Sequence, residues 1–268
     1  MKKIKFVNNI KLINKHKHDK HIYFGSETCE RKLFCLNDLK NIVSKNNKQQ
    51  ITLVFPYLTP KHFDEVKKMF PFISLHRNIF CEVVFNDWGL FYFIRNNYPK
   101  IKLCLGRLLH KQKTDPYFDD IINGKQKISY LKNNIFIPKK ISKETKDYFS
   151  QLPVNSKIFQ NFMMKNNIVR VETDNFNWKM NLKLPKAIKA SLYYPYVHIT
   201  TTRFCGYLNM LKDNKCNKHC EKFNIELKKY RIPYNYIVRG NSVDYKNINL
   251  PHKKELEKNN IDRIVINE

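Results

Sequence analysis

Residues 51–85, ITLVFPYLTPKHFDEVKKMFPFISLHRNIFCEVVF, contain the pattern that decides the fold. Residues 51–55 are a short β-branched and aromatic run, typical of a buried strand, and residues 57–60 form the turn after it. Residues 61–70 carry apolar side chains at helical spacing, and residues 80–85 are a second apolar run. A strand, an amphipathic helix and another strand in this order predict parallel strands joined by a right-handed crossover.

The same alternation of strand and helix patterns continues along the chain and predicts eight strands. Eight such units close naturally into a (β/α)8 barrel, and six ungrouped glycines disfavour an open doubly wound sheet with a nucleotide-binding loop. We therefore expect an α/β, TIM-like barrel as a single domain over residues 21–268, preceded by a basic N-terminal segment at residues 1–20. The expected strands are residues 21–24, 51–55, 80–85, 101–105, 134–137, 168–172, 196–201 and 234–239.

The charge balance is strongly basic: 50 Lys and Arg against 23 Asp and Glu give a formal net charge of +27. Such a field favours RNA or other anionic partners. Most of the excess is Lys in a chain rich in Asn and Ile, as A/T-rich coding would also produce. No apolar run approaches the roughly 20 residues that span a bilayer, and no export signal is present, so a cytoplasmic protein without a membrane span is expected.

Three of the seven cysteines lie close together in the loop at residues 203–222. Cys205, Cys216 and Cys220 directly follow the expected strand 196–201, and the last two have a spacing that places both sulfurs on one side of a helical turn. Clustered thiolates bind soft metals, and a four-iron four-sulfur (4Fe-4S) cluster needs four of them. Without an export signal, metal ligands or reduced thiols are favoured over disulfides.

The fourth ligand has to come from a neighbouring loop at the same end of the barrel. Cys29 follows the first expected strand and is our first choice, and Cys35 is the second. Zinc is an equal alternative on spacing alone, with His219 or Cys29 completing a tetrahedron, and free thiols are the less favoured third. Cys81 and Cys104 lie within strands, where a buried cysteine packs as a small apolar side chain.

Three strings together resemble the peptidase U-32 family, and most closely its UbiV-like branch. They are IYFGSETC at residues 22–29, EVVFNDWG at residues 82–89, and residues 196–205 followed by Cys216 and Cys220. The resemblance implies a TIM-like barrel whose 4Fe-4S cluster is held by Cys29, Cys205, Cys216 and Cys220. It also implies oxygen-independent hydroxylation of a quinone precursor or of RNA bases, and a second U-32-type subunit as partner.

Four further residues are candidates for substrate binding. Asn86 and Asp87 end the third expected strand and Arg107 ends the fourth, so a barrel would bring these three to the same opening as the cluster. Arg203 lies two residues before Cys205. Asp87 has a structural alternative as a helix cap. No sequence motif of a serine, cysteine or zinc protease is present, so the residues do not support peptidase activity. The zinc alternative predicts a metal-stabilised RNA-binding protein.

Overall fold

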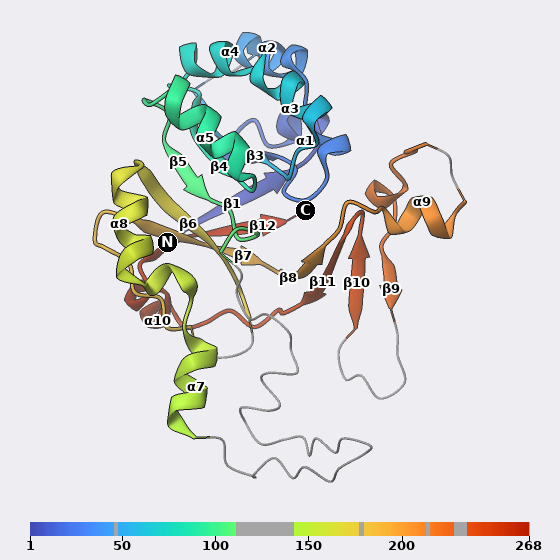
Figure 1. Ribbon diagram of the computed structural model, residues 1–268. Helices are drawn as coiled ribbons and strands as arrows, with labels where there is room; N and C mark the ends of the chain where they lie inside the picture. Colours follow the sequence, from blue (N-terminus) through green and yellow to red (C-terminus); the bar gives the residue numbers. More distant parts are fainter. Residues whose placement is uncertain (46–47, 111–141, 177–179, 213–214, 228–234, 268) are drawn as a thin grey trace.

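Eight parallel strands form a closed barrel in the computed structural model, which describes residues 1–45, 48–110, 142–176, 180–212, 215–227 and 235–267 (Figure 1). The order around the barrel is β1-β12-β7-β6-β5-β4-β3-β2, and every pair is parallel. The predicted α/β barrel is therefore confirmed. The strands are β1 (Lys2–Val7), β2 (His21–Gly25), β3 (Gln50–Phe55), β4 (Phe80–Phe85), β5 (Leu103–Leu105), β6 (Ile168–Asp174), β7 (Lys189–Tyr194) and β12 (Ile261–Asn267).

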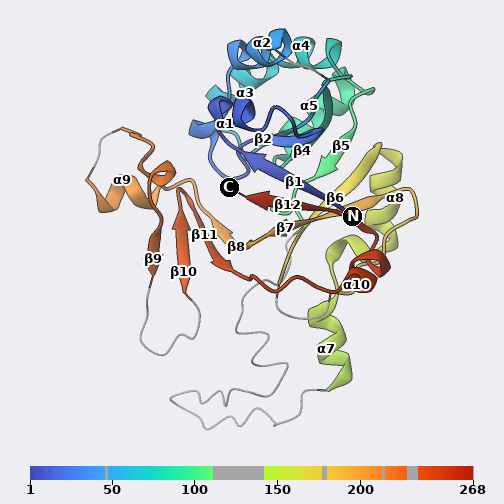
Figure 2. The same cartoon turned by 180° about the vertical axis from the view of Figure 1, so that it is seen from behind.

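A four-stranded antiparallel sheet leaves the barrel after β7 and precedes β12. Its order is β8 (Tyr196–Thr201), β11 (Ser242–Lys246), β10 (Tyr236–Arg239) and β9 (Ile225–Leu227). Figure 2 shows this sheet projecting from the barrel on the side away from α8 and α10. The segment between β8 and β9 contains α9 (Gly206–Met210) and the short 3-10 helix η3 (His219–Glu221).

Helices follow most of the barrel strands. They are α1 (Ile10–Lys15), α2 (Leu36–Lys45), α3 (Pro60–Lys67), α4 (Phe70–Leu75), α5 (Trp88–Asn97), α7 (Lys143–Ser150), α8 (Lys157–Lys165) and α10 (Lys253–Lys258). The short 3-10 helices η1 (Glu30–Lys32) and η2 (Pro153–Asn155) lie in loops. Among the helices in the described ranges, none combines the length and the hydropathy needed to cross a bilayer.

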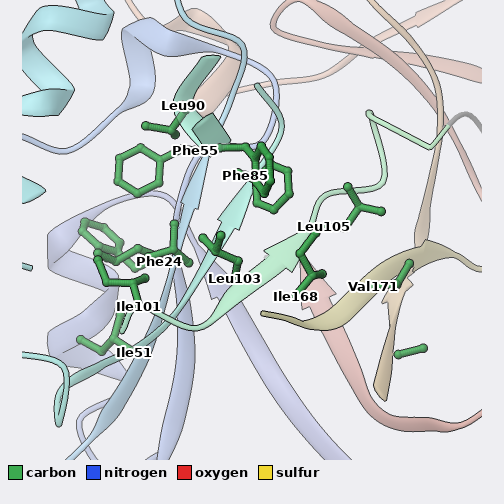
Figure 3. Close-up of a cluster of buried hydrophobic side chains, with 14 of the residues drawn as sticks. Phe24, Ile51, Phe55, Phe85, Leu90, Ile101, Leu103, Leu105, Ile168 and Val171 are labelled. Atoms are coloured by element: carbon green, nitrogen blue, oxygen red, sulfur yellow. The ribbon is translucent and has the colours of Figure 1, made fainter. Parts of the chain in front are cut away.

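Side-chain alternation along the strands divides the core into two layers. On β3, Leu53 and Phe55 belong to the large apolar cluster that packs against the helices, whereas Val54 belongs to a smaller cluster within the barrel. Figure 3 shows part of the outer layer, where Phe55 and Phe85 lie near Leu90 of α5. The outer layer explains why β3 and β4 are recognisable from sequence as apolar runs.

The barrel interior also contains a buried ionic network. Arg263 donates to Glu82 with distances of 2.6 and 3.3 Å and to the Tyr23 hydroxyl at 2.8 Å. Tyr23 in turn donates to Glu172, which also accepts from Ser191. Most of these polar groups pair with one another, although Glu172 Oε2 and Arg263 Nε are buried without a hydrogen-bond partner.

Two expected barrel strands are corrected by the structure. Residues 196–201 form β8 and, within the expected strand 234–239, residues 236–239 form β10; both belong to the antiparallel sheet and not to the barrel. Both runs do form strands, but they pair antiparallel within the second sheet, and an apolar run alone predicts a strand without identifying its partner. The expected strand at 134–137 lies outside the described residues.

The boundary at residue 20 is also corrected. Residues 1–20, expected as a basic segment outside the barrel, contain β1 and α1, and β1 pairs with both β2 and β12. Three lysines interrupt the apolar pattern of β1, so the sequence does not predict this strand. Ile4 and Phe6 of β1 are buried in the barrel interior. The barrel therefore begins at the first residues of the chain.

Candidate metal centre

Four cysteines from two distant parts of the chain line a single cavity. Cys29 lies just beyond β2 and precedes η1, Cys205 precedes α9, Cys216 lies in the following loop, and Cys220 lies in η3. The volume of this cavity, here called the cysteine cavity, is about 470 Å³. The structure thus brings together the four cysteines that the sequence selects.

The turn between β10 and β11 holds the cysteine loop against the barrel. The side-chain amide of Asn241 donates to the carbonyl of Thr28 at 2.8 Å and to that of Thr202 at 2.7 Å. It therefore links the segment that carries Cys29 to the segment that carries Cys205. The sequence predicts at Gly240 and Asn241 either a turn that approaches the cysteine site or a plain turn, and these two bonds place the turn beside the cysteine segments.

Gly240, in the same turn, lies close to two of the sulfurs. The Cys205 thiol contacts the Gly240 carbonyl at 3.9 Å, and a Cβ atom at Gly240 would lie 3.6 Å from the sulfur of Cys220. The φ angle of Gly240 is +73°, a left-handed conformation that favours glycine. A side chain here would therefore strain the turn and occupy space beside Cys220.

The spacing of the four sulfurs is wider than a single metal ion requires. Within the described residues, the one set of three His, Cys, Asp or Glu ligand atoms that all lie within 4.8 Å of one another is His21, Cys81 and Glu82. No three of the four cavity sulfurs therefore come that close together. Tetrahedral zinc with Zn–S bonds of about 2.3 Å would hold its sulfurs about 3.8 Å apart.

Burial raises the pKa of the Cys29 thiol, and the neighbouring Cys220 and Cys216 raise it further when charged. The backbone N–H of Arg31 and the charge of Lys32 oppose this effect. Thiols bind metals as thiolates, so clustered thiolates in a partly buried cavity need positive charge to hold them. The cavity has the donor atoms for a metal group. The positive groups near Cys29, however, do not cancel the rise in its pKa that burial causes.

The alternative ligands do not lie in this cavity. Cys35, the second choice for the fourth ligand, is exposed, and neither it nor His219 lines the cavity. Cys104 is fully buried in β5, as expected for an apolar packing role. Arg203 does line the cysteine cavity, beside Cys205.

A second, polar cavity of about 330 Å³ lies at the carboxyl ends of the barrel strands and is here called the mouth pocket. It shares Thr28, Lys32 and Cys220 with the cysteine cavity, so the two spaces adjoin. Its polar and charged lining includes Asn8, Ser26, Glu27, Arg107, Lys222, Arg239, Ser242, Asp244 and Asn267.

Arg239 reaches the mouth pocket from the antiparallel sheet. Its guanidinium carbon lies 3.9 Å from the centre of the Tyr196 ring, and one of its nitrogens lies 3.8 Å from Asp244. Asp244 is buried and also pairs with His198 at 3.4 Å. The sheet therefore supplies one wall of the pocket with charged groups that sequence reasoning missed, because residues 234–239 were expected to be part of the barrel.

Arg107 lines the mouth pocket, but four of its five N–H donors are already used. It donates twice to the Glu27 carboxylate, at 2.7 Å each, once to Asp174, and once to the Tyr196 carbonyl at 2.9 Å. Its guanidinium also lies 4.4 Å from the centre of the Tyr193 ring. The expected substrate-binding arginine therefore fastens the ends of β2 and β6 to the start of β8.

Asn86 and Asp87 line neither cavity. Asn86 is fully buried, and its amide donates to the Phe55 carbonyl at 3.0 Å. Asp87 accepts from the backbone N–H of Leu90 at 2.8 Å, so the helix cap that the sequence offers as its structural role is confirmed. Both side chains brace strand ends, and substrate contact by either stays a prediction.

The His21, Cys81 and Glu82 group lies at the opposite end of the barrel and is already paired. Arg263 donates to both oxygens of Glu82, and Arg170 lies 3.7 Å from the same carboxylate. Two guanidinium groups beside one carboxylate neutralise it and repel a metal cation. This group therefore belongs to the ionic network of the barrel interior.

Comparisons of the chain with models of protein families, with curated proteins and with solved structures found no match. The site is consequently interpreted from its own geometry and from the sequence strings that resemble the U-32 family.

Proposed function

We propose that this chain is an iron-sulfur protein whose Cys29, Cys205, Cys216 and Cys220 hold a 4Fe-4S cluster at the mouth of the barrel. The observation that carries the proposal is the convergence of these four residues on the cysteine cavity, although Cys29 and Cys205 lie 176 positions apart in the sequence. A remote fourth cysteine is a common feature of cluster ligation, because the cluster needs four thiolates in space and not in sequence.

The spacing of the sulfurs supports a cluster over a single zinc ion. A cubane presents four separate iron atoms to its ligands, so its thiolates stand farther apart than those around one ion. No three of the cavity sulfurs lie within 4.8 Å of one another in the described part of the chain. A single zinc ion would need these sulfurs to come closer together than a cluster would.

The reaction that we propose is oxygen-independent hydroxylation or a related redox modification, as the resemblance to the U-32 family implies. A bound cluster would supply one-electron chemistry at Cys220, which faces both cavities. The mouth pocket is the natural place for the substrate, because Lys32, Lys222 and Arg239 offer hydrogen-bond donors and positive charge there. The family resemblance also makes a second U-32-type subunit a candidate partner.

Anaerobic purification with iron and sulfide analysis tests the cluster. We expect about four irons and four sulfides per chain and a broad absorbance near ~400 nm, as is typical of such clusters. Cys216→Ala and Cys29→Ala should abolish or strongly reduce all three signals. Cys35→Ala is the matched control, since Cys35 is an exposed cysteine close to Cys29 in sequence and outside the cavity, and it should leave them unchanged.

The opposite result would reject the proposal. An anaerobic preparation without iron and sulfide, or a Cys216→Ala protein with an unchanged spectrum, is incompatible with the assigned ligands. Loss of the cluster in Cys35→Ala but not in Cys29→Ala would show that Cys35, and not Cys29, is the fourth ligand.

The net charge of +27 favours one other function, a zinc-stabilised RNA-binding protein without catalysis. It predicts about one zinc per chain, no visible absorbance, and RNA binding that weakens steeply as salt rises, because counterion release drives such binding. Iron and sulfide in the purified protein, with zinc absent, would exclude this alternative.

A further inference from the structure

The segment that carries three of the four cysteines also exposes an unusual amount of apolar surface. We define the cysteine lobe as residues 203–227, of which all but 213–214 are described. Of the fifteen exposed large apolar side chains in the described residues, five lie on this lobe: Phe204, Met210, Leu211, Phe223 and Leu227. Phe204 is 56% exposed and precedes Cys205 directly. Exposed apolar groups concentrated on one lobe indicate an interaction surface.

Basic side chains accompany this apolar surface. Exposed lysines and arginines on or beside the lobe are Arg31, Arg203, Lys212, Lys215, Lys218 and Lys222, and Lys32 is partly exposed in the cavity wall. In the described part of the lobe, the exposed carboxylates are Glu221 and Glu226. The surface beside the cysteine cavity is therefore positive, in a chain that is already strongly basic.

We propose that the cysteine lobe is the docking surface for a small acidic electron-carrier protein that reduces the cluster. This inference rests on the proposed iron-sulfur function, because it gives the cluster its source of electrons. The carrier loses one electron and the cluster gains it, with no bond made or broken. The positive lobe selects an acidic partner, and all four cysteines are partly exposed beneath it, so the docked carrier would lie next to the cluster.

The character of the lobe favours a protein over RNA as the occupant. Three of its five exposed large apolar side chains, Met210, Leu211 and Leu227, are not aromatic, whereas single-stranded RNA is held mainly by stacking on aromatic groups. Methionine and aromatic residues are enriched at the centres of protein interfaces. Lysine predominates among the basic residues, although arginine is the better bidentate ligand for phosphate. Electron-transfer complexes also need only a small contact area, below about 1,200 Å² in total.

The test measures the rate at which flavodoxin hydroquinone, an acidic carrier, reduces the oxidised holoprotein in a stopped-flow instrument. Lys212→Glu/Lys215→Glu places negative charge on the lobe without touching a cavity residue. We expect the second-order rate constant at low salt to fall on the order of tenfold, and the salt dependence of the remaining rate to weaken. Met210→Glu should lower the rate as well, because it puts a charge into the apolar part of the surface.

The matched control is Lys254→Glu/Lys258→Glu on α10, which makes the same change in net charge. Both lysines are exposed, and Figures 1 and 2 place α10 on the opposite side of the molecule from α9. The control rate should stay within about twofold of the parent rate, because long-range steering weakens beyond a Debye length of about 10 Å. Absorbance at ~400 nm, before and after dithionite, counts the reducible cluster in each variant.

Each other outcome has a defined meaning. A full cluster that dithionite reduces, together with equal carrier rates in the lobe and control variants, overturns the docking proposal and leaves the iron-sulfur function intact. No cluster in the parent protein overturns both. If the lobe variant keeps its carrier rate but loses RNA binding, or changes from dimer to monomer in sedimentation, the occupant is RNA or a second copy, and the docking proposal is wrong.

Discussion

Replacing Arg107 with Met should destabilise the protein far more than it alters any substrate contact. The side chains of Arg107, Glu27 and Asp174 are 2%, 6% and 3% exposed, so the two carboxylates cannot recover solvation when the guanidinium is removed. Removing one partner of a buried ion pair costs about 3–5 kcal/mol. Arg107 serves two carboxylates, but Asp174 keeps its hydrogen bond from the His198 backbone. We therefore expect a loss of about 4 kcal/mol.

Urea denaturation, followed by circular dichroism, measures this loss. With a slope of about 3 kcal/mol per molar for a chain of this size, the midpoint should fall by roughly 1–2 M. The Arg107→Met/Glu27→Gln/Asp174→Asn triple variant is the control, because it removes the charges along with the arginine. It should recover at least half of the lost stability.

The pH dependence of the loss identifies its electrostatic origin. Burial raises the pKa of Asp174 even in the parent protein, where Arg107 opposes the rise. Without Arg107, the folded-state pKa of Asp174 rises further above its unfolded value, so stability falls as pH increases between those two values. The loss should therefore be smaller at pH 5 than at pH 8. A loss below about 1 kcal/mol, or one that is equal at both pH values, would refute the clamp that we assign to Arg107.

Three further changes test individual parts of the fold. Asp87→Ala should cost about 1–2 kcal/mol because it removes the cap from Leu90, and a matched Asp87→Asn should retain most of the stability. Gly25→Ala should cost at least about 3 kcal/mol, since φ is +136° and the added Cβ would lie 2.2 Å from the Val54 carbonyl oxygen; near-parental stability would contradict that backbone. Burial raises the pKa of Glu172 to about 7, so its charge costs stability as pH rises from about 4.5 to 7. Glu172→Gln should therefore gain about 2 kcal/mol relative to the parent between pH 5 and pH 8, and a gap independent of pH would exclude this.

The part of the barrel with an apolar outer face is predictable from sequence. β2, β3, β4 and β6 bury apolar side chains against helices, and their runs predict strands close to the observed bounds. β12 is harder to recognise because Asp262 and Arg263 interrupt its apolar residues. Arg263 is buried in the interior network, a tertiary fact that no local pattern contains. Charged side chains that pair inside a barrel interrupt the apolar runs of its strands, so a hydrophobicity pattern does not reveal those strands.

The candidate site also has a part that the sequence predicts and a part that it does not. Cysteines are rare enough that their spacing points to a shared ligand, and the position of Cys29 after a strand predicts which end of the barrel it occupies. The wall of the mouth pocket is not predictable in this manner. Arg239 and Asp244 come from an antiparallel sheet whose existence depends on long-range pairing, and both residue types are common on solvated surfaces. Glu27 likewise carries no local signal until Arg107 is found beside it.

The position of the antiparallel sheet gives a structural reason for the proposed metal centre to take ligands from both parts of the chain. The sheet is one excursion between β7 and α10, and the cysteine lobe lies within it, beyond the barrel's own ladder. Its links to the barrel mouth include the Asn241 bonds to Thr28 and Thr202 and the Arg107 bond to the Tyr196 carbonyl. A metal group that joined Cys29 to the lobe would add covalent links across this same boundary, and metal binding of this kind contributes to folding free energy. The ligand arrangement that we propose for the cluster would therefore also hold the wall of the mouth pocket in place relative to its base.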